Sequence, residues 1–131
     1  MDPNQNQNNA HKRILVIEDE EFLRDLYVRI LKSEGYTIDQ AKDGAEAFAA
    51  LQEGGYDLVL LDIMLPVMNG LDILKKLTKV PPKKENKSIL ILTNLDQDIA
   101  VAEGISYGVT GYLLKNTTSA ADLRQVVRKY I

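Results

Sequence analysis

The run Leu58-Val59-Leu60-Leu61 is apolar at every position and is followed directly by Asp62. A short run without alternating polar residues is typical of a strand that a parallel sheet buries on both faces. Three similar runs also end at polar side chains: residues 14–17 precede Glu18 and Asp19, residues 89–92 precede Thr93, and residues 112–114 precede Lys115. In open parallel sheets, ligands bind beyond the carboxyl ends of the strands. The sequence therefore predicts one site that combines three carboxylates, a hydroxyl and an ammonium.

Strand and helix patterns alternate five times along the chain. The expected strands cover residues 13–17, 37–41, 56–61, 88–92 and 111–114, and apolar residues at helical spacing follow each of them. Asp43, Asn69 and Ser119 stand where side-chain caps would open three of the helices. This alternation predicts an α/β fold, a doubly wound five-stranded parallel sheet with helices on both faces. The flavodoxin-like strand order 2-1-3-4-5 suits this length and places the first strand beside the third.

Length and composition limit the classes of protein that the chain can be. Its 131 residues, of which 45% are hydrophobic, suffice for one domain with a full core. The absence of cysteine excludes disulfides and thiol chemistry, and a net charge of −3 argues against non-specific nucleic-acid binding. No apolar run is long enough to cross a membrane, and the amino terminus does not resemble a signal peptide. We predict a cytoplasmic protein with a disordered tail at residues 1–11 and one domain at residues 12–131.

The polar residues at the strand ends have a consistent chemistry. Three carboxylates that lie close together repel one another unless a cation binds, and oxygen ligands alone favour Mg²⁺. Mg²⁺ with few protein ligands can also bind a phosphoryl group, whose charge Lys115 would neutralise and to which Thr93 would donate a hydrogen bond. A carboxylate can be the nucleophile and form an aspartyl phosphate. Asp62 is the best candidate because Glu18 and Asp19 form an adjacent pair suited to cation binding.

Four motifs together resemble the receiver domain of bacterial two-component response regulators. They are residues 17–20 (Ile-Glu-Asp-Glu), 61–70 (Leu-Asp-Ile-Met-Leu-Pro-Val-Met-Asn-Gly), 92–94 (Leu-Thr-Asn) and 111–115 (Gly-Tyr-Leu-Leu-Lys), and the match extends over residues 12–131. The resemblance implies a phosphorelay signalling module rather than an enzyme. In it, Asp62 would accept a phosphoryl group from a phosphohistidine on a sensor kinase or a histidine phosphotransfer protein. Glu18, Asp19, Asp62 and the backbone carbonyl of Met64 would hold Mg²⁺.

The resemblance further implies a conformational switch. Lys115 would contact Asp62 before the transfer and a phosphoryl oxygen afterwards. Thr93 would move towards the phosphoryl group and Tyr112 would follow it inwards, which would change the face formed by the fourth helix, the fifth strand and the fifth helix. This face would bind a downstream protein or an output domain outside this sequence, and it would also suit a dimer, although a monomer is the default expectation. No direct contact with nucleic acid or with a membrane is expected.

Several positions depart from the family pattern or tune it. Asn116 follows Lys115 where receivers commonly have a proline after a cis peptide bond. Whether the bond between Lys115 and Asn116 is cis or trans, and hence where Lys115 lies, stays open. Asn94 stands where many receivers have a small residue, and its amide would either narrow the pocket or donate to a phosphoryl oxygen. Met64 and Leu95 occupy the two positions that tune loss of the phosphoryl group in the family. Neither can orient an attacking water, so we predict slow self-dephosphorylation.

Other interpretations of these residues are compatible with the sequence alone. Glu18 and Asp19 would also suit a cap on the following helix. A Mg²⁺-dependent phosphatase would use the same nucleophile, but it needs a second aspartate where Met64 stands. A pure interaction module would keep the fold without accepting a phosphoryl group. The lysines at 83, 84 and 87 indicate a solvated loop, and Arg124, Arg128 and Lys129 indicate a solvated face of the last helix.

Overall fold

The computed structural model describes residues 9–94, 98–115 and 118–131. These residues contain five strands and five helices: β1 (Arg13–Ile17), α2 (Glu21–Ser33), β2 (Thr37–Ala41), α3 (Gly44–Glu53), β3 (Leu58–Asp62), α4 (Gly70–Lys79), β4 (Ile89–Thr93), α5 (Asp98–Ser106), β5 (Gly111–Leu114) and α6 (Ala120–Tyr130). The predicted alternation is confirmed. Strand β3 begins two residues later than expected and ends at Asp62, and β4 begins one residue later and ends at Thr93. Among the described residues, no helix has the length and apolar character needed to cross a membrane.

The strands form one parallel sheet in the predicted order β2-β1-β3-β4-β5. Ile17 at the end of β1 pairs with Leu61 of β3, and Asp62 pairs with Leu92 of β4. Because all neighbouring strands are parallel, their carboxyl ends share one edge of the sheet. The register therefore places the residues that follow β1 directly beside the end of β3.

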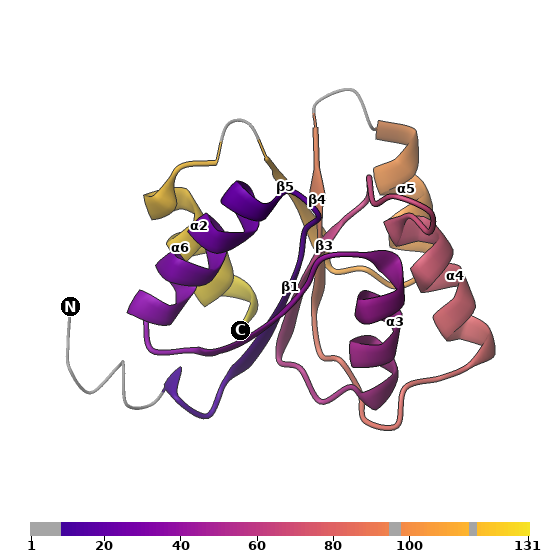
Figure 1. The fold of residues 1–131 in the computed structure, drawn as a ribbon, viewed down its shortest axis with the longest axis horizontal. Helices are drawn as coiled ribbons and strands as arrows, with labels where there is room; N and C mark the ends of the chain where they lie inside the picture. The colour runs from indigo at the N-terminus through magenta and orange to yellow at the C-terminus, as the bar shows by residue number, and fades with distance from the viewer. Residues whose placement is uncertain (1–8, 95–97, 116–117) are drawn as a thin grey trace.

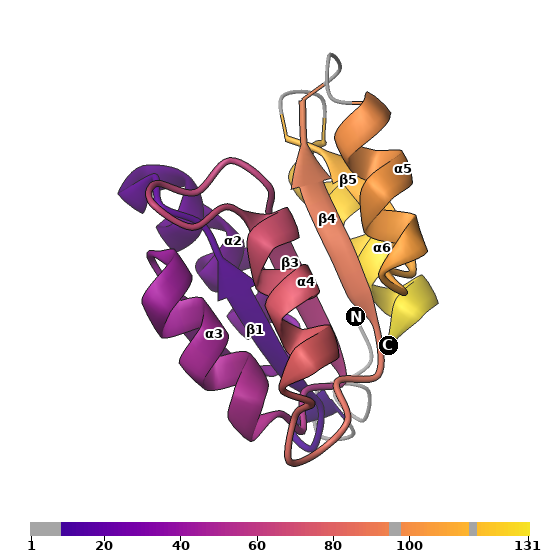
Figure 2. The same cartoon turned by 90° about the vertical axis from the view of Figure 1, so that its right-hand side faces the viewer.

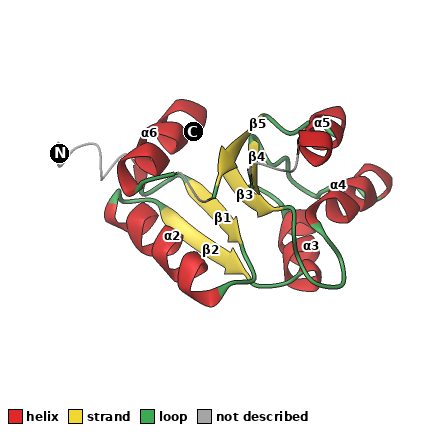
Figure 3. Ribbon diagram, turned by 90° about the horizontal axis from the view of Figure 1, so that it is seen from above, coloured by secondary structure: helices red, strands yellow, loops and turns green. Residues whose placement is uncertain are grey.

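Helices cover both faces of the sheet (Figure 1, Figure 3). Helices α2 and α6 lie on one face, and α3, α4 and α5 lie along the other (Figure 2). Successive side chains of a strand point to opposite faces, so Ile14 and Val16 of β1 join the core cluster beneath α2 and α6. Leu15 and Ile17 of the same strand join the cluster with α3 and α4. This burial on both faces is why β1, β3 and β4 are apolar at nearly every position, whereas the edge strand β2 is mostly polar and exposed.

Capping side chains begin three helices at the predicted positions. Asn69 and Ser119 each form a capping box with an aspartate three residues later. Asp43 caps α3 by accepting a hydrogen bond at 2.8 Å from the backbone N–H of Glu46. These caps fix where the chain leaves each strand-end loop and enters a helix.

Helix α2 is capped by Glu20. Its carboxylate accepts hydrogen bonds from the backbone N–H groups of Phe22 at 3.2 Å and Leu23 at 2.9 Å. Glu20 thus takes the capping role that was an alternative explanation for Glu18 and Asp19. Those two acids are therefore available for another purpose.

An ion pair between a buried carboxylate and partly exposed arginines joins the end of α2 to α6. Glu34 follows α2 and is almost fully buried, and its Oε1 lies 2.7 Å from Nη2 of Arg128 and 3.7 Å from Nε of Arg124. A buried carboxylate is strongly unfavourable without such partners. The expectation that these arginines only solvate the outer face of the last helix was therefore incomplete.

Residues 1–8 of the predicted tail lie outside the described residues. Of the remainder, Asn9 donates its side-chain amide to the carbonyl oxygen of Glu34 at 2.7 Å. Thr37 donates its hydroxyl to the carbonyl oxygen of Ala10 at 3.0 Å. The disordered tail stays a prediction, and its last residues contact the loop between α2 and β2.

Val67 in the loop between β3 and α4 has a φ of 68° and a fully exposed side chain. A β-branched residue in this left-handed region is strained by about 1–2 kcal/mol. We expect Val67→Asn to raise the free energy of unfolding by about 1 kcal/mol, because asparagine tolerates this conformation. Urea unfolding followed by circular dichroism measures the difference. Equal stability of Val67→Asn and wild type would contradict the assigned strain. Val67→Ala is the control, because it removes the β-branch without adding the amide that stabilises asparagine in this conformation.

Candidate phosphoryl-acceptor and metal site

Three carboxylates converge at the carboxyl edge of the sheet. Glu18 and Asp19 follow β1, and Asp62 ends β3, which is the neighbour of β1 in the sheet. One carboxylate oxygen from each residue lies within 4.8 Å of the others. Glu18 and Asp62 are buried, whereas Asp19 is exposed, so solvent reaches the cluster from the side of Asp19. The structure thus brings together the three acids that the sequence placed at neighbouring strand ends.

Lys115 joins this cluster from the end of β5. Its ammonium lies 2.7 Å from Oε1 of Glu18 and 3.1 Å from Oδ2 of Asp62, and its side chain is only 15% exposed. The backbone N–H of Lys115 donates to the carbonyl oxygen of Thr93 at 2.8 Å, which holds the end of β5 beside β4. One ammonium is thus shared by two buried carboxylates. With Asp19 included, the ionised cluster has an excess of negative charge.

Burial and repulsion decide which groups of the cluster hold protons. Burial raises the pKa of Glu18 to about 8, and Asp62 acts in the same direction, while Lys115 opposes the shift. Burial alone would lower the pKa of Lys115, but its contacts with Glu18 and Asp62 outweigh this effect and raise that pKa. Near pH 7 Lys115 is therefore charged, and Glu18 holds a proton when no cation is bound.

Glu18 also presents an oxygen atom that suits a cation. Its buried Oε1 has no hydrogen bond of normal geometry among the described residues, although the ammonium of Lys115 lies 2.7 Å away. The other oxygen, Oε2, accepts a hydrogen bond from Lys115 at 3.1 Å. A buried oxygen whose contact is a single ammonium can accept a further ligand, and a divalent cation among the three carboxylates would bind this one. Carboxylate oxygens at the solvent-accessible edge of the sheet suit Mg²⁺ better than they suit softer metal ions.

The backbone around Asp62 fixes its carboxylate. Oδ1 accepts a hydrogen bond at 3.0 Å from the backbone N–H of Met64, which leaves Oδ2 facing Lys115. Behind it, Gly70 lets the start of α4 approach closely, since a Cβ on Gly70 would lie 2.7 Å from the carbonyl oxygen of Asp62. The side chain of Met64 is 61% exposed. The candidate nucleophile is therefore oriented by the fold before any ligand binds.

Thr93 lies on the neighbouring strand. It ends β4, one residue after the Leu92 that pairs with Asp62, and its side chain is buried. Its hydroxyl donates to the carbonyl oxygen of the half-buried Asn94 at 3.1 Å. The structure thus places Thr93 at the same edge of the sheet as the acid cluster, on the strand next to Asp62.

The remaining predicted residues are less directly connected to the cluster. Tyr112 of β5 has a side chain that is 54% exposed, so its ring lies outside the core. Leu95 and Asn116 lie outside the described residues, and so does the peptide bond between Lys115 and Asn116. The role of the Met64 carbonyl as a ligand stays a prediction.

Two residues near the site were not expected from the sequence. Arg24 of α2 donates from Nη1 to the carbonyl oxygen of Glu18 at 2.8 Å and from Nε to the side chain of Gln40 at 3.2 Å. Tyr27 is buried, and this burial, together with the charge of Glu18, raises its pKa to about 12. Neither residue stands at a strand end or in one of the four motifs that resemble the family, and these were the two signals that marked site residues in the sequence.

The comparison with protein families identifies this arrangement. The model of the response regulator receiver domain matches residues 14–128. The chain belongs to this family. The resemblance inferred from the four motifs is thereby confirmed, and the domain is a signalling domain of two-component systems with an acidic pocket at the expected edge of its sheet.

Curated relatives of this receiver domain are longer proteins. The transcriptional regulatory protein YcbL of Bacillus subtilis is 38% identical over 101 residues, which are 77% of this chain and 43% of YcbL. The sensory transduction protein RegX3 of Mycolicibacterium smegmatis is 33% identical over 119 residues, which are 88% of this chain and 50% of RegX3. The chain therefore spans about half the length of the curated relatives it matches.

Solved structures share the fold over nearly the whole chain. The chemotaxis protein CheY4 of Vibrio cholerae has a TM-score of 0.80 and 27% identity, and the match covers 93% of this chain and 100% of that one. The response regulator TrrA of Thermotoga maritima, solved in complex with Mg²⁺ and BeF, has a TM-score of 0.75 and 35% identity, with 92% and 99% covered. The flavodoxin-like receiver fold predicted from the sequence is therefore confirmed.

Proposed function

We propose that Asp62 of this receiver domain accepts a phosphoryl group and thereby switches the domain between two signalling states. The donor is a phosphohistidine on a sensor histidine kinase or on a histidine phosphotransfer protein. The observation that carries the proposal is the 3.1 Å contact between the carboxylate of Asp62 and the ammonium of Lys115, inside a cluster with Glu18 and Asp19. A nucleophilic carboxylate, a fixed cation and an acidic metal site are the groups that phosphoryl transfer to aspartate requires.

In the transfer, an oxygen of the Asp62 carboxylate forms a bond to phosphorus while the bond between phosphorus and the histidine nitrogen breaks. The electron pair of the broken bond stays on the imidazole nitrogen. Glu18, Asp19 and Asp62, together with the carbonyl of Met64, would hold Mg²⁺, which supplies neutralising charge next to the phosphoryl oxygens when it is bound. The complex of the related protein TrrA with Mg²⁺ and BeF supports this choice of ion. The hydrogen bond from Met64 keeps the Asp62 carboxylate in one orientation for in-line attack.

The phosphoryl group changes the partners of the surrounding side chains. Lys115 moves its contact from the Asp62 carboxylate to a phosphoryl oxygen, and Thr93 turns its hydroxyl from the carbonyl of Asn94 to the same group. Tyr112, now exposed, follows Thr93 inwards and changes the face formed by α5, β5 and α6. These contacts form only in the phosphorylated state, so they shift the population towards the active conformation.

Intact mass spectrometry after incubation with acetyl phosphate and Mg²⁺ tests the acceptor. We expect one added phosphoryl group, which is absent in Asp62→Asn and absent when Mg²⁺ is removed by a chelator. Transfer from a phosphorylated histidine kinase is the second arm, because small donors and protein donors enter the site differently. Phosphorylation that persists in Asp62→Asn, or no phosphorylation from either donor, would overturn the proposal.

Mg²⁺ binding is expected to release a proton and to strengthen as the pH rises from 5 towards the pKa of Glu18 at about 8. The sign follows because a raised pKa means that Glu18 is protonated in this range without metal, and Mg²⁺ requires the ionised carboxylate. Isothermal titration calorimetry at pH 7, in two buffers with different ionisation enthalpies, measures the released proton. In Glu18→Gln the heats should agree between the buffers. If the heat of Mg²⁺ binding to the wild type is the same in both buffers, no proton is released and the predicted coupling between Mg²⁺ binding and Glu18 is wrong.

The phosphorylated domain is expected to lose its phosphoryl group slowly, because the exposed thioether of Met64 and the apolar Leu95 cannot orient an attacking water. We expect the double variant Met64→Asn, Leu95→Glu to shorten the lifetime of the phosphoryl group by about tenfold or more. Decay of the added mass after removal of the donor measures this lifetime. An unchanged lifetime would show that these two positions do not limit hydrolysis here, and Met64→Leu is the apolar control.

We further propose that residues 12–131 form the signalling unit and that its output is protein binding. The face of α5, β5 and α6 would bind a downstream protein or an attached output domain. The domain would be a monomer by default, and the same face would also suit a dimer. The half-length match to regulators such as YcbL supports an output beyond this domain.

A further inference from the structure

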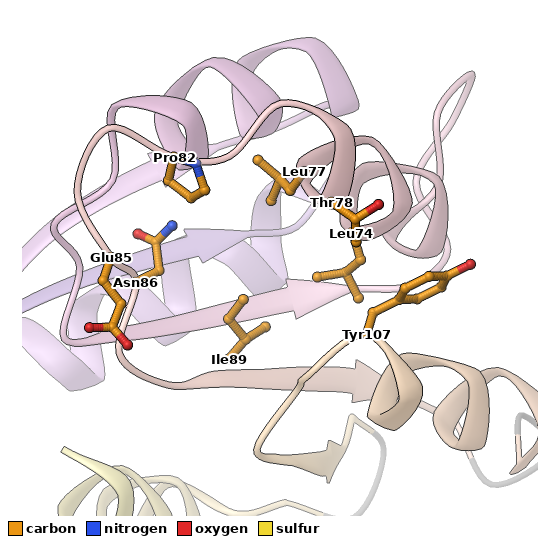
Figure 4. A pocket seen from close by; sticks show the side chains of 8 residues that line it. All are labelled: Leu74, Leu77, Thr78, Pro82, Glu85, Asn86, Ile89 and Tyr107. Carbon is orange, nitrogen blue, oxygen red and sulfur yellow. The ribbon is translucent and has the colours of Figure 1, made fainter.

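A groove lies beside Ile89 of β4 (Figure 4), at the opposite end of that strand from Leu92, the residue that pairs with Asp62. Its volume is about 370 Å³, and its apolar lining comes from Leu74 and Leu77 of α4, Pro82 of the next loop, Ile89, and Tyr107 after α5. Ile89 is the first residue of β4, whereas the phosphoryl site lies beyond the last residue of that strand. The size suits one or two apolar side chains of a ligand. A ligand in the groove would not obstruct the phosphoryl site.

The chain around this groove carries a concentrated positive charge. Residues 75–87, which include the end of α4 and the loop before β4, contain six lysines and one glutamate, a net charge of +5. The whole chain has a net charge of −3, so the other residues together carry −8. All six lysines are exposed. A patch this positive on an otherwise negative protein creates an electrostatic field that attracts acidic partners.

Three of these lysines have a side-chain partner among the residues that the structure describes. Lys76 lies over the ring of Phe48 at 4.3 Å, Lys83 pairs with Glu53 at 2.8 Å, and Lys87 pairs with Asp57 at 3.2 Å. Lys75, Lys79 and Lys84 make no ion pair with any described residue. Two of the three, Lys75 and Lys79, lie on α4 on either side of Thr78, whose side chain lines the groove.

The loop that carries the lysines is fixed to the body of the domain. The backbone N–H of Lys83 donates to the carbonyl oxygen of Gln52 at 2.7 Å, and the backbone of Lys84 forms a bridge with Gly54. The amide of Asn86 donates to the carbonyl oxygen of Leu51 at 3.1 Å. A preorganised surface of this kind loses little conformational entropy when a partner binds.

We propose that this groove docks an acidic segment of a partner protein, which places an apolar side chain in the groove and carboxylates near Lys75, Lys79 and Lys84. Nucleic acid is the less favoured occupant, because five of the eight lining residues are apolar or aromatic, one is the acidic Glu85, and a phosphate backbone has no apolar side chain to place among them. An anionic membrane is less favoured because Leu74 is 3% exposed and lies in a recess, where it cannot insert into lipid. The inference does not depend on phosphorylation of Asp62.

A selection from a peptide display library of random sequence, with the full chain as bait, tests the proposal. We expect the enriched peptides to combine carboxylates with at least one large apolar residue. A synthetic copy of the most enriched peptide, labelled with fluorescein, then gives a Kd by fluorescence polarisation. Amide shifts in NMR spectra should identify the contact at Thr78, Asn86 and Tyr107.

Three variants separate binding in the groove from general electrostatic attraction, and a fourth separates it from the phosphoryl site. The first is a triple variant that should weaken binding of the peptide by about tenfold or more: Lys75→Glu, Lys79→Glu, Lys84→Glu. The second is a control triple variant with the same change in net charge elsewhere, and it should have little effect: Lys32→Glu, Lys42→Glu, Lys129→Glu. Thr78→Trp should fill the groove without removing core packing and abolish binding. Asp62→Asn should bind the peptide as tightly as the wild type does. The docking proposal can therefore be judged even if the phosphorylation proposal fails.

Several results would overturn the proposal. One is a selection without enrichment of acidic peptides, and another is equal weakening by the two triple variants. Tighter binding of an oligonucleotide or of vesicles containing phosphatidylserine through the same lysines would assign the patch to another class of partner. Association of the chain with itself through the groove, measured by analytical ultracentrifugation of the wild type and Thr78→Trp, would do the same.

Discussion

Replacement of Lys115 by methionine is expected to slow phosphorylation of Asp62 by about 100-fold or more. The ammonium of Lys115 is shared between Glu18 at 2.7 Å and Asp62 at 3.1 Å, and its side chain is 15% exposed, so little solvent screens it. In the transition state negative charge approaches these carboxylates, and a preorganised cation in a buried site is worth far more there than in water. Methionine fills a similar volume but supplies no charge.

The rate is measured by intact mass at increasing times after addition of acetyl phosphate and Mg²⁺. Lys129→Met is the matched control, because Lys129 is exposed in the last turn of α6 and its loss removes the same charge outside the site. Circular dichroism verifies that both variants are folded. The pKa of Glu18 should rise further in Lys115→Met, because Lys115 is a group that lowers it. A rate close to that of the wild type would show that Lys115 is only a structural counter-ion.

Replacement of Gly54 by alanine is expected to cost about 3–5 kcal/mol of unfolding free energy. Gly54 ends α3 with a φ of 71°, and a Cβ at this position would overlap the carbonyl oxygen of Lys84, with which Gly54 forms a bridge. The obstacle is backbone rather than a flexible side chain, so the loop before β4 would have to move. The loss therefore combines a steric overlap with the strain of a side chain in the left-handed region.

Gly108→Ala isolates the second of these contributions. Gly108 has a φ of 93°, but among the described residues no heavy atom beyond Gly108 and its two chain neighbours lies within 4 Å of the position that a Cβ would occupy. Its replacement should cost only about 1 kcal/mol, which is the strain alone. Urea unfolding monitored by circular dichroism compares the two variants. Equal losses would show that the close approach of Lys84 relaxes without cost.

The positions of the candidate acids followed from the sequence because two simple rules fix them. Apolar runs identified the strands, and alternation with helices required a parallel sheet whose carboxyl ends share an edge. In the order 2-1-3-4-5 the first and third strands are neighbours, so Glu18, Asp19 and Asp62 had to meet there. The caps at Asn69 and Ser119 were equally predictable, because a cap depends on residues only three positions apart.

The structure alone decided the features that depend on packing between distant segments. Lys115 and Glu18 are 97 residues apart in the chain, and only the fold shows that one ammonium contacts both Glu18 and Asp62. Full burial of Glu18, and hence its raised pKa, depends on all the elements around it. The pairing of Arg128 with buried Glu34 joins two helices in the same way.

The lysine-rich segment shows the same division most clearly. The sequence itself contained the lysines, and composition indicated a solvated loop. Only the tertiary structure brings Leu74 of α4, Ile89 of β4 and Tyr107 together as a groove beside them. Local sequence determines which residues are apolar or charged and where strands and helices begin. Which of these residues share a surface is decided by the packing of elements far apart in the chain, since side-chain contacts and burial are properties of the folded whole.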